Sequence, residues 1–361
     1  MSQFNLIVIG ILMALALLAV LLLSGVIPGF SLGGPSGKPV PVVIWGTIPS
    51  EYFAGLISDL NEQNKNLFIL EYVQKNPVTF ENELIDALAS AKGPDIWLLS
   101  EDSILKNKNK IAPIPFASFS ERFFKDTFIG EGELYLSDSG IIALPFTIDP
   151  IILYWNRDLF ANAGISQPPK FWDEFVAAVS NLTNRDSLNN IIQAGAALGE
   201  FNNIDHSQDI ISFLILQTGN PIVDSNNLEA TLTESGNSPI NPAESAIRFF
   251  TEFSDPAKTT YSWNRSLASS KKAFIAGTLV MYFGYASEYK DIQAKNPHLN
   301  FDVSEIPQIK GGGIKATFGK MSGLAVSKVS PNASAAMTAA VKLTEKDSIA
   351  KISQIIFLPP V

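Results

Sequence analysis

The feature that most constrains this sequence is an alternation of short apolar runs with helical stripes over residues 42–99. Three runs have the length and composition of buried strands, at 42–45, 67–73 and 95–99. Between them, apolar residues recur at helical spacing, over 52–60 and 80–88. Because strands separated by helices require crossover connections, the sequence predicts an α/β fold with an open parallel sheet.

An open sheet of this kind also predicts where a ligand binds. Ligands lie beyond the carboxyl ends of the strands, where the strand order reverses. We therefore expect ligand contacts from Trp45 and Thr47 after the first strand, and from Ser100 and Glu101 after the third.

A proline-punctuated segment at 143–156 is predicted to be extended. Pro145 and Pro150 each fix φ and lack a backbone donor, so we do not expect a central strand throughout. A chain crossing between two lobes would have this composition. After it, Asn156 is predicted to cap a short helix that ends at Gly164. Further helices are expected over 172–179 and 209–219.

The N-terminal residues 6–23 form an unbroken apolar run without a charge. As a helix this run would span ~27 Å, close to the thickness of a hydrocarbon core. It is either a cleaved signal or a retained anchor. Its length, and the lack of a small-residue cleavage pattern after it, favour a transmembrane anchor. The Gly/Pro/Ser-rich stretch 24–39 would then be a tether, so residues 1–40 are expected to attach the globular part to the cell membrane.

Composition excludes several classes of function. At 361 residues the chain exceeds what one hydrophobic core usually fills, so two lobes are expected. A net charge of −9 without a basic stripe argues against nucleic-acid binding. The absence of cysteine excludes disulfides, thiolate metal sites and cysteine nucleophiles. His206 and His298 stand apart in polar surroundings, so we expect no metal, no cofactor and no catalytic residue.

Two phrases carry a family resemblance. ALPFTIDPIILYWNRDLFANAGISQPPKFWDEF occupies 143–175, and AFIAGTLVMYFG occupies 273–284. In this order and at this spacing they resemble the patterns of extracellular solute-binding proteins of ABC importers, in the maltose- and oligosaccharide-binding branch. The resemblance covers most of the chain from about Val40 onward. It implies a two-lobe periplasmic-binding-protein fold of type II that holds a sugar or oligosaccharide-like ligand between hinged lobes.

The expected lobes are discontinuous in sequence. Lobe 1 would comprise 41–146 and 307–358, and lobe 2 would comprise 147–306 and 359–361. The chain would then cross between the lobes near 145–149, 304–308 and 358–361. In proteins that it resembles, further helices follow a phrase such as Leu358-Pro359-Pro360, so the C-terminus is expected to be incomplete.

The resemblance also implies ligand contacts in the second half of the chain. Asp149 aligns with an acidic sugar contact of this branch, and Trp263 lies where the family often brings an aromatic side chain toward the ligand. Lys320 precedes a strand that matches a first-lobe strand beside the ligand. The residues that match the ligand-edge loop of the second lobe are Tyr282, Gly284 and Tyr285.

These expectations describe a monomeric, membrane-anchored receptor whose globular part is extracytoplasmic and delivers its ligand to ABC permease subunits. Two other functions remain open. The same fold can serve as a tethered sensor or adhesin that acts on a partner kinase or scaffold. A membrane-tethered glycoside hydrolase would use Glu101 and Asp149 as its carboxylate pair, although nothing local in the sequence supports catalysis.

Overall fold

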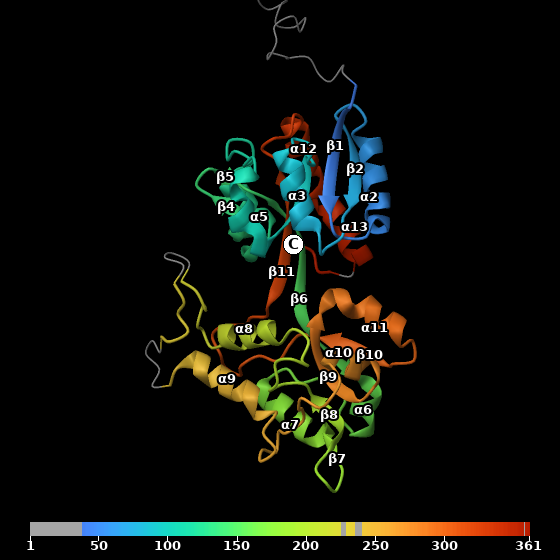
Figure 1. The fold of residues 1–361 in the computed structure, drawn as a ribbon, viewed down its shortest axis with the longest axis vertical. Coiled ribbons are helices and arrows are strands. Elements are labelled where there is room, and N and C mark those ends of the chain that lie inside the picture. The colour runs from blue at the N-terminus through green and yellow to red at the C-terminus, as the bar shows by residue number, and fades with distance from the viewer. Residues whose placement is uncertain (1–37, 225–228, 235–239, 357) are drawn as a thin grey trace, which may run out of the picture. The chain divides into compact units, whose positions relative to one another are not determined.

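The computed structural model describes residues 38–224, 229–234, 240–356 and 358–361. The chain divides into two compact units, whose elements are labelled in Figure 1. Unit 1 comprises the described residues up to Phe146 together with Gly323–Ile352, and unit 2 comprises Thr147–Ser322 and Ser353–Val361. The predicted membrane helix at 6–23 lies outside the described residues. Within the described part of the chain, no helix has both the length and the apolar character needed to cross a bilayer.

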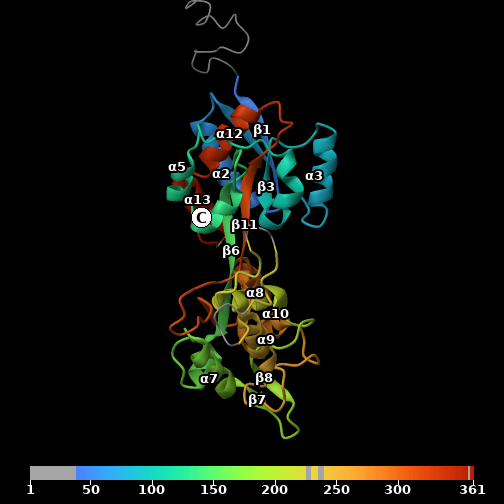
Figure 2. The same cartoon turned by 90° about the vertical axis from the view of Figure 1, so that its left-hand side faces the viewer.

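Unit 1 begins with the predicted strand–helix alternation. The parallel strands β1 (Val40–Gly46), β2 (Phe68–Gln74) and β3 (Ile96–Ser100) lie in the order β2-β1-β3. Helix α2 (Ser50–Gln63) connects β1 to β2, and α3 (Phe80–Ala89) connects β2 to β3. The two connections run in opposite directions along the sheet, so right-handed crossovers place α2 and α3 on opposite faces, as Figure 2 shows. The predictions for these five elements are confirmed.

The C-terminal part of the chain completes unit 1. Strand β11 (Gly319–Val326) lies between β3 and β6 in the strand order, and α12 (Ala333–Leu343) packs on β1 and β2. Fully buried alanines on α12 allow this close approach. The remaining elements are α13 (Lys346–Ile356), α4 (Ile104–Asn107), α5 (Glu121–Thr127), the short strands β4 (Leu136–Ser137) and β5 (Gly140–Ile141), and the 3₁₀ helices Glu101–Ser103, Lys108–Lys110 and Gly130–Tyr135.

One prediction about the sheet is wrong. Strand β6 (Leu144–Asn156) is a strand throughout, and it lies between β11 and β9 in the strand order. The prolines are tolerated because of where they fall. Pro145 is the second residue of the strand, and Pro150 comes just before Ile151, the first residue paired with β9. A missing N–H therefore interrupts no bond of that ladder.

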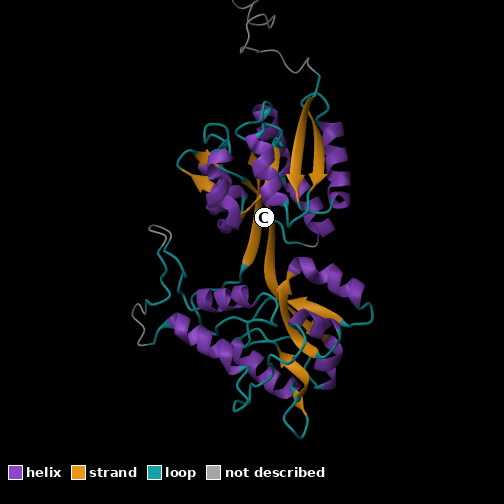
Figure 3. Ribbon diagram, in the orientation of Figure 1, coloured by secondary structure: helices purple, strands orange, loops and turns teal. Residues whose placement is uncertain are grey.

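Unit 2 has a mixed sheet with the strand order β6-β9-β8-β7, and Figure 3 shows the helices that surround it. Strand β9 (Leu279–Tyr285) is antiparallel to β6 and parallel to β8 (Ile191–Ala196). The edge strands are β7 (Asn184–Arg185), paired with β8, and β10 (Phe301–Ser304), paired with β6. The helices are α6 (Arg157–Asn162), α7 (Trp172–Leu182), α8 (Ser207–Gln217), α9 (Pro242–Glu252), α10 (Ser270–Ile275), α11 (Tyr289–Lys295) and the 3₁₀ helix Ala286–Glu288.

Local signals place several of these helices correctly. Asn156 accepts from Leu159 N at 3.1 Å and caps α6, and Gly164 follows the helix with a φ of +73°. Both were predicted from sequence. Trp172 and Phe175 on α7 join an aromatic core with Phe213 of α8 and Phe283 of β9. This core fixes α7 and α8 against β9.

The chain passes between the units after Phe146, Ser322 and Ile352. The second and third passages were expected near 304–308 and 358–361. The unit boundaries differ from this expectation, and residues 307–322 lie in unit 2 rather than in the unit that contains β1. Hydrogen bonds explain the difference. Gln308 N donates to Lys170 O at 3.0 Å, and Thr317 Oγ1 donates to Ile151 O at 2.8 Å.

Candidate functional site

The carboxyl end of β9 forms the centre of the candidate site in unit 2. All seven residues of this strand are buried, since β6 and β8 flank it on both edges. Tyr282, Gly284 and Tyr285 therefore arrive together where the strand ends and the 3₁₀ helix Ala286–Glu288 begins. A Cβ on Gly284 would come within 2.4 Å of Tyr282 Cε1, so only glycine lets the Tyr282 ring lie here.

Glu288 connects this strand end to two other elements. Its Oε2 accepts from the Tyr282 hydroxyl at 2.8 Å, and its Oε1 lies 2.5 Å from His206 Nε2, just before α8. Lys271 Nζ of α10 lies 3.3 Å from Oε2. Burial alone would raise the pKa of the Glu288 carboxyl, but the bonds from His206 and Tyr282 and the nearby charges outweigh it and hold that pKa below its usual value. Burial also raises the pKa of the Tyr282 hydroxyl, which therefore stays a proton donor to Glu288.

Asp149 lies half-buried on β6 beside this network. Its Oδ1 accepts from Ser287 N at 3.0 Å. Burial raises the pKa of the Asp149 carboxyl, and the charge of Glu288 adds to that effect. The bonds from Ser287 and the charge of Lys320 oppose it. The result is a partly desolvated carboxylate, which bonds strongly to any hydroxyl that reaches it.

Tyr285 and Lys320 lie next to the same network. Lys320 Nζ lies 4.3 Å from the centroid of the Tyr285 ring, a cation–π distance. The Tyr285 hydroxyl donates to Asp209 Oδ2 at 2.8 Å, and the His206 ring meets the Tyr285 ring edge-on at 4.7 Å. Tyr285 is thus held on its ring and on its hydroxyl. Lys320 is exposed, and its ammonium can donate to a ligand.

Two further candidate contacts in unit 2 were not predicted from sequence. Glu200 and Phe201 lie in the loop that follows β8, whose carboxyl end is at the same edge as that of its parallel neighbour β9. Phe201 is 58% exposed, an unusual position for a large aromatic side chain, and Glu200 Oε1 lies 3.4 Å from Arg265 Nε. Ligands bind beyond the carboxyl ends of strands, so both residues would have been candidates if β8 had been predicted. The sequence around β8 is polar, and no strand was expected there.

Trp263 has a different environment from the one expected. It is 0% exposed, and its indole N–H donates to Asn203 Oδ1 at 3.2 Å. Its ring belongs to the core of unit 2, so in this structure it offers no face to a ligand.

The four candidate residues of unit 1 lie at or just after the carboxyl ends of two neighbouring strands. Trp45 is the last residue but one of β1 with Thr47 just after the strand, and Ser100 ends the parallel neighbour β3 with Glu101 just after it. All four are half-buried. Lys75 Nζ lies 3.6 Å from the Trp45 ring centroid. Ser100 Oγ donates to Asp102 Oδ1 at 2.6 Å. This edge therefore combines an aromatic ring, hydroxyl groups and carboxylates, as the strand-end rule predicts.

Comparison with known proteins decides the family. The model of the bacterial extracellular solute-binding protein family matches residues 55–361. The chain belongs to this family. The resemblance stated from the two sequence phrases is thereby confirmed. A search among curated protein sequences finds no match.

Solved structures of solute-binding proteins share this fold at low sequence identity. A cyclic alpha-maltosyl-1,6-maltose binding protein from Arthrobacter globiformis has a TM-score of 0.73 and 17% identity over 90% of this chain and 80% of that one. A cyclo/maltodextrin-binding protein complexed with maltotetraose has a TM-score of 0.70 and 18% identity over 91% and 80%. An ABC transporter solute-binding protein from Thermotoga lettingae bound with alpha-D-tagatose has a TM-score of 0.62 and 19% identity over 90% and 81%. These likenesses establish an α/β solute-binding fold.

Within this solute-binding protein, the candidate groups suit hydrogen bonding to hydroxyls. Carboxylates accept, and Lys320 donates. Among the described residues, no group of three or more histidine, cysteine or acidic side chains could hold a metal ion. Glu101 lies in unit 1 and Asp149 in unit 2.

Proposed function

We propose that this chain is the membrane-anchored, extracytoplasmic receptor of an ABC importer, and that it binds a sugar or oligosaccharide-like solute with residues of both units. The observation that carries the proposal is the family match over residues 55–361. The structural neighbours add support, because their ligands are maltotetraose, alpha-D-tagatose and related sugars. The apolar run at 6–23 supports anchoring to the membrane.

The proposed contacts divide by chemistry. Asp149 accepts hydroxyl protons and Lys320 donates to ring or hydroxyl oxygens, and each lies within three residues of a passage between the units. In unit 1, Trp45 supplies an aromatic face, while Thr47, Ser100 and Glu101 supply polar contacts. In unit 2, Phe201 supplies a further aromatic face. Ligand that contacts both units favours whichever arrangement of the units allows those contacts, and a permease can recognise that arrangement.

Calorimetric titration of the full chain with a panel of neutral sugars tests the proposal. At least one sugar should bind, and Asp149→Asn and Lys320→Met should each weaken its binding about tenfold or more, since each removes a charge-assisted hydrogen bond. Lys328→Met is the matched control, because Lys328 is an exposed lysine just after β11. If no sugar binds, or if both site variants bind like the control, the proposed function fails.

A further inference from the structure

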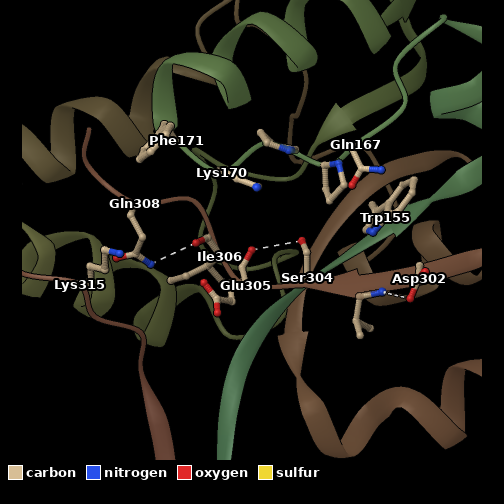
Figure 4. A pocket seen from close by; sticks show the side chains of 13 residues that line it. Trp155, Gln167, Lys170, Phe171, Asp302, Ser304, Glu305, Ile306, Gln308 and Lys315 are labelled. Atoms are coloured by element: carbon tan, nitrogen blue, oxygen red, sulfur yellow. Dashed lines mark hydrogen bonds between the residues drawn. The ribbon is translucent and has the colours of Figure 1, made fainter. Parts of the chain in front are cut away.

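A pocket of about 510 Å³ lies entirely within unit 2, on the side of β6 that carries the edge strand β10 (Figure 4). One wall is the chain from Asp302 to Gln308, and the other is the loop 167–171 before α7. Backbone bonds join the two walls at one end, where Trp172 N donates to Gln308 O at 3.2 Å. Beyond this junction the walls separate and leave a space within the range of small-molecule sites.

The indole nitrogen of Trp155 is the first indication that a ligand binds in this pocket. Its side chain is 9% exposed, and its Nε1 has no hydrogen-bond partner among the described residues. Figure 4 shows its ring at one end of the pocket with the nitrogen on the pocket side. Buried donors are nearly always satisfied in folded proteins, because an unmet N–H is destabilising. The nitrogen itself is almost completely covered, so a ligand oxygen satisfies it once the side chains around it shift slightly.

Some of the polar side chains around the pocket have partners, since Gln308 bonds to Ala316 and Ser304 to Glu305 O, but four do not. Within the described residues, the side chains of Gln167, Lys170, Glu305 and Lys315 form no hydrogen bond or ion pair. The lining holds two lysines, Lys170 and Lys315, and two acidic residues, Glu305 and Asp302, so its formal charges cancel. Asp302 Oδ2 also lies 4.0 Å from Arg157 Nη1. A lining of this kind favours an uncharged ligand that both donates and accepts hydrogen bonds.

Another part of the lining consists of flat apolar side chains. Pro168, Pro169 and Phe171 stand along the loop wall, and Trp155 ends the pocket. Sugar rings present hydroxyl groups at their edges and C–H surfaces on their faces, which match polar rims and flat apolar walls respectively. A single aromatic hydrocarbon would leave the polar groups unpaired, and a strongly charged ligand would meet like charge.

We propose that this pocket is a second ligand site that binds an uncharged, polyhydroxylated molecule of one or two sugar rings. It is separate from the solute site proposed above. Trp155 follows Asp149 by six residues along β6, which corresponds to about 20 Å at the rise of an extended strand. The inference does not require that the transported solute itself be a sugar.

Indole N–H resonances of the full nitrogen-15-labelled chain give a site-specific test. The chain has five tryptophans, and Trp155→Phe assigns the Trp155 signal by its disappearance. Maltose, mannobiose, D-glucose and D-mannose serve as probes. At least one should shift the Trp155 signal saturably, and the shift should persist in Asp149→Asn. A shift at Trp45 without one at Trp155 for any probe overturns the inference and leaves the proposed function standing. A shift at Trp155 alone supports the inference and counts against the proposed function.

Affinity measurements on variants then localise the ligand. Glu305→Ala and Trp155→Phe should each weaken the probe detected at Trp155 about fivefold to tenfold, since each removes one hydrogen bond. Glu62→Ala, at an exposed position of α2 in unit 1, is the matched control and should bind like the parent. Unchanged affinity in both pocket variants would show that the ligand lies elsewhere and would refute the inference, as would a Trp155 signal that no probe moves.

Discussion

Glu288 and Glu305 are the same chemical group in the same unit, yet their surroundings differ completely. Glu288 has an 11% exposed side chain and bonds to Tyr282, His206 and Lys271. Glu305 is exposed at the pocket beside β10, and its carboxylate bonds to no described residue. The comparison separates two roles for polar groups at a binding surface. Carboxylates that already bond to protein groups hold the backbone and the aromatic rings in place. Carboxylates without such bonds remain available to a ligand.

The largest expected effect follows from this contrast. Glu288→Ala removes the acceptor of the buried Tyr282 hydroxyl and the carboxylate partner of half-buried His206, so it should lower the free energy of unfolding by about 3 kcal/mol. Lys271 keeps its contact with Asp291 at 2.8 Å. Glu305→Ala removes no bond and should change that free energy by less than about 0.5 kcal/mol. Denaturant unfolding of both variants measures the difference. Equal losses in the two variants would mean that the Glu288 bonds do not stabilise unit 2.

A smaller effect concerns the glycine next to this network. Gly284→Ala places a methyl group against the Tyr282 ring, which cannot swing aside without breaking its bond to Glu288. We expect a loss of about 2 kcal/mol. The control is Gly313→Ala, because an added Cβ at Gly313 would meet no atom within 4 Å. Thermal and denaturant unfolding report both. A loss of the same size at Gly313 would contradict the assignment of the effect to the crowded Tyr282 ring.

The smallest effect is a difference in pH dependence between Asp149 and Glu288. The folded-state pKa of Glu288 lies below its usual value of 4.5, so its stabilisation is present above that pH and is lost as pH falls through the lower folded value. The folded-state pKa of Asp149 lies above its usual value of 3.8, so its contribution has the opposite sign. It is fully present below that pH and is lost as pH rises through the higher folded value.

Unfolding free energies of the parent, Glu288→Gln and Asp149→Asn, measured between about pH 3 and pH 7, check both signs. The advantage of the parent over Glu288→Gln should shrink in acid, and its advantage over Asp149→Asn should grow. Sugar affinity should also fall in acid for the parent and not for Asp149→Asn. Parallel curves for the two variants would contradict the assigned environments.

The sequence predicted what local pattern controls. The alternation at 42–99 gave three strands and two helices because period and composition report burial directly. Asn156 and Gly164 marked both ends of α6 through their own backbone preferences. The same reasoning failed for β6, because the cost of a proline depends on which N–H the neighbouring strand needs. That requirement is not visible along the chain.

The sequence predicted that the candidate contacts lie at strand ends. It could not predict which of their side chains are free to bond to a ligand. Tyr282 and Tyr285 lie where the sequence placed them, but their hydroxyls are already bonded to Glu288 and Asp209. Trp263 lies wholly in the core. The partners that decide this, such as His206 for Glu288, are distant in sequence and belong to a polar region with little periodicity.

By itself, the sequence determined the alternation of strands and helices, the family and the edges of the sheets where ligand contacts belong, since each follows from short-range periodicity or from a contiguous phrase. Only the tertiary structure decided which of those side chains are bonded and which are free. It also brought Trp155, the loop 167–171 and the end of β10 around one pocket. The physical reason is that hydrogen bonding and burial are set by neighbours in space, and the sheet makes neighbours of residues far apart in the chain.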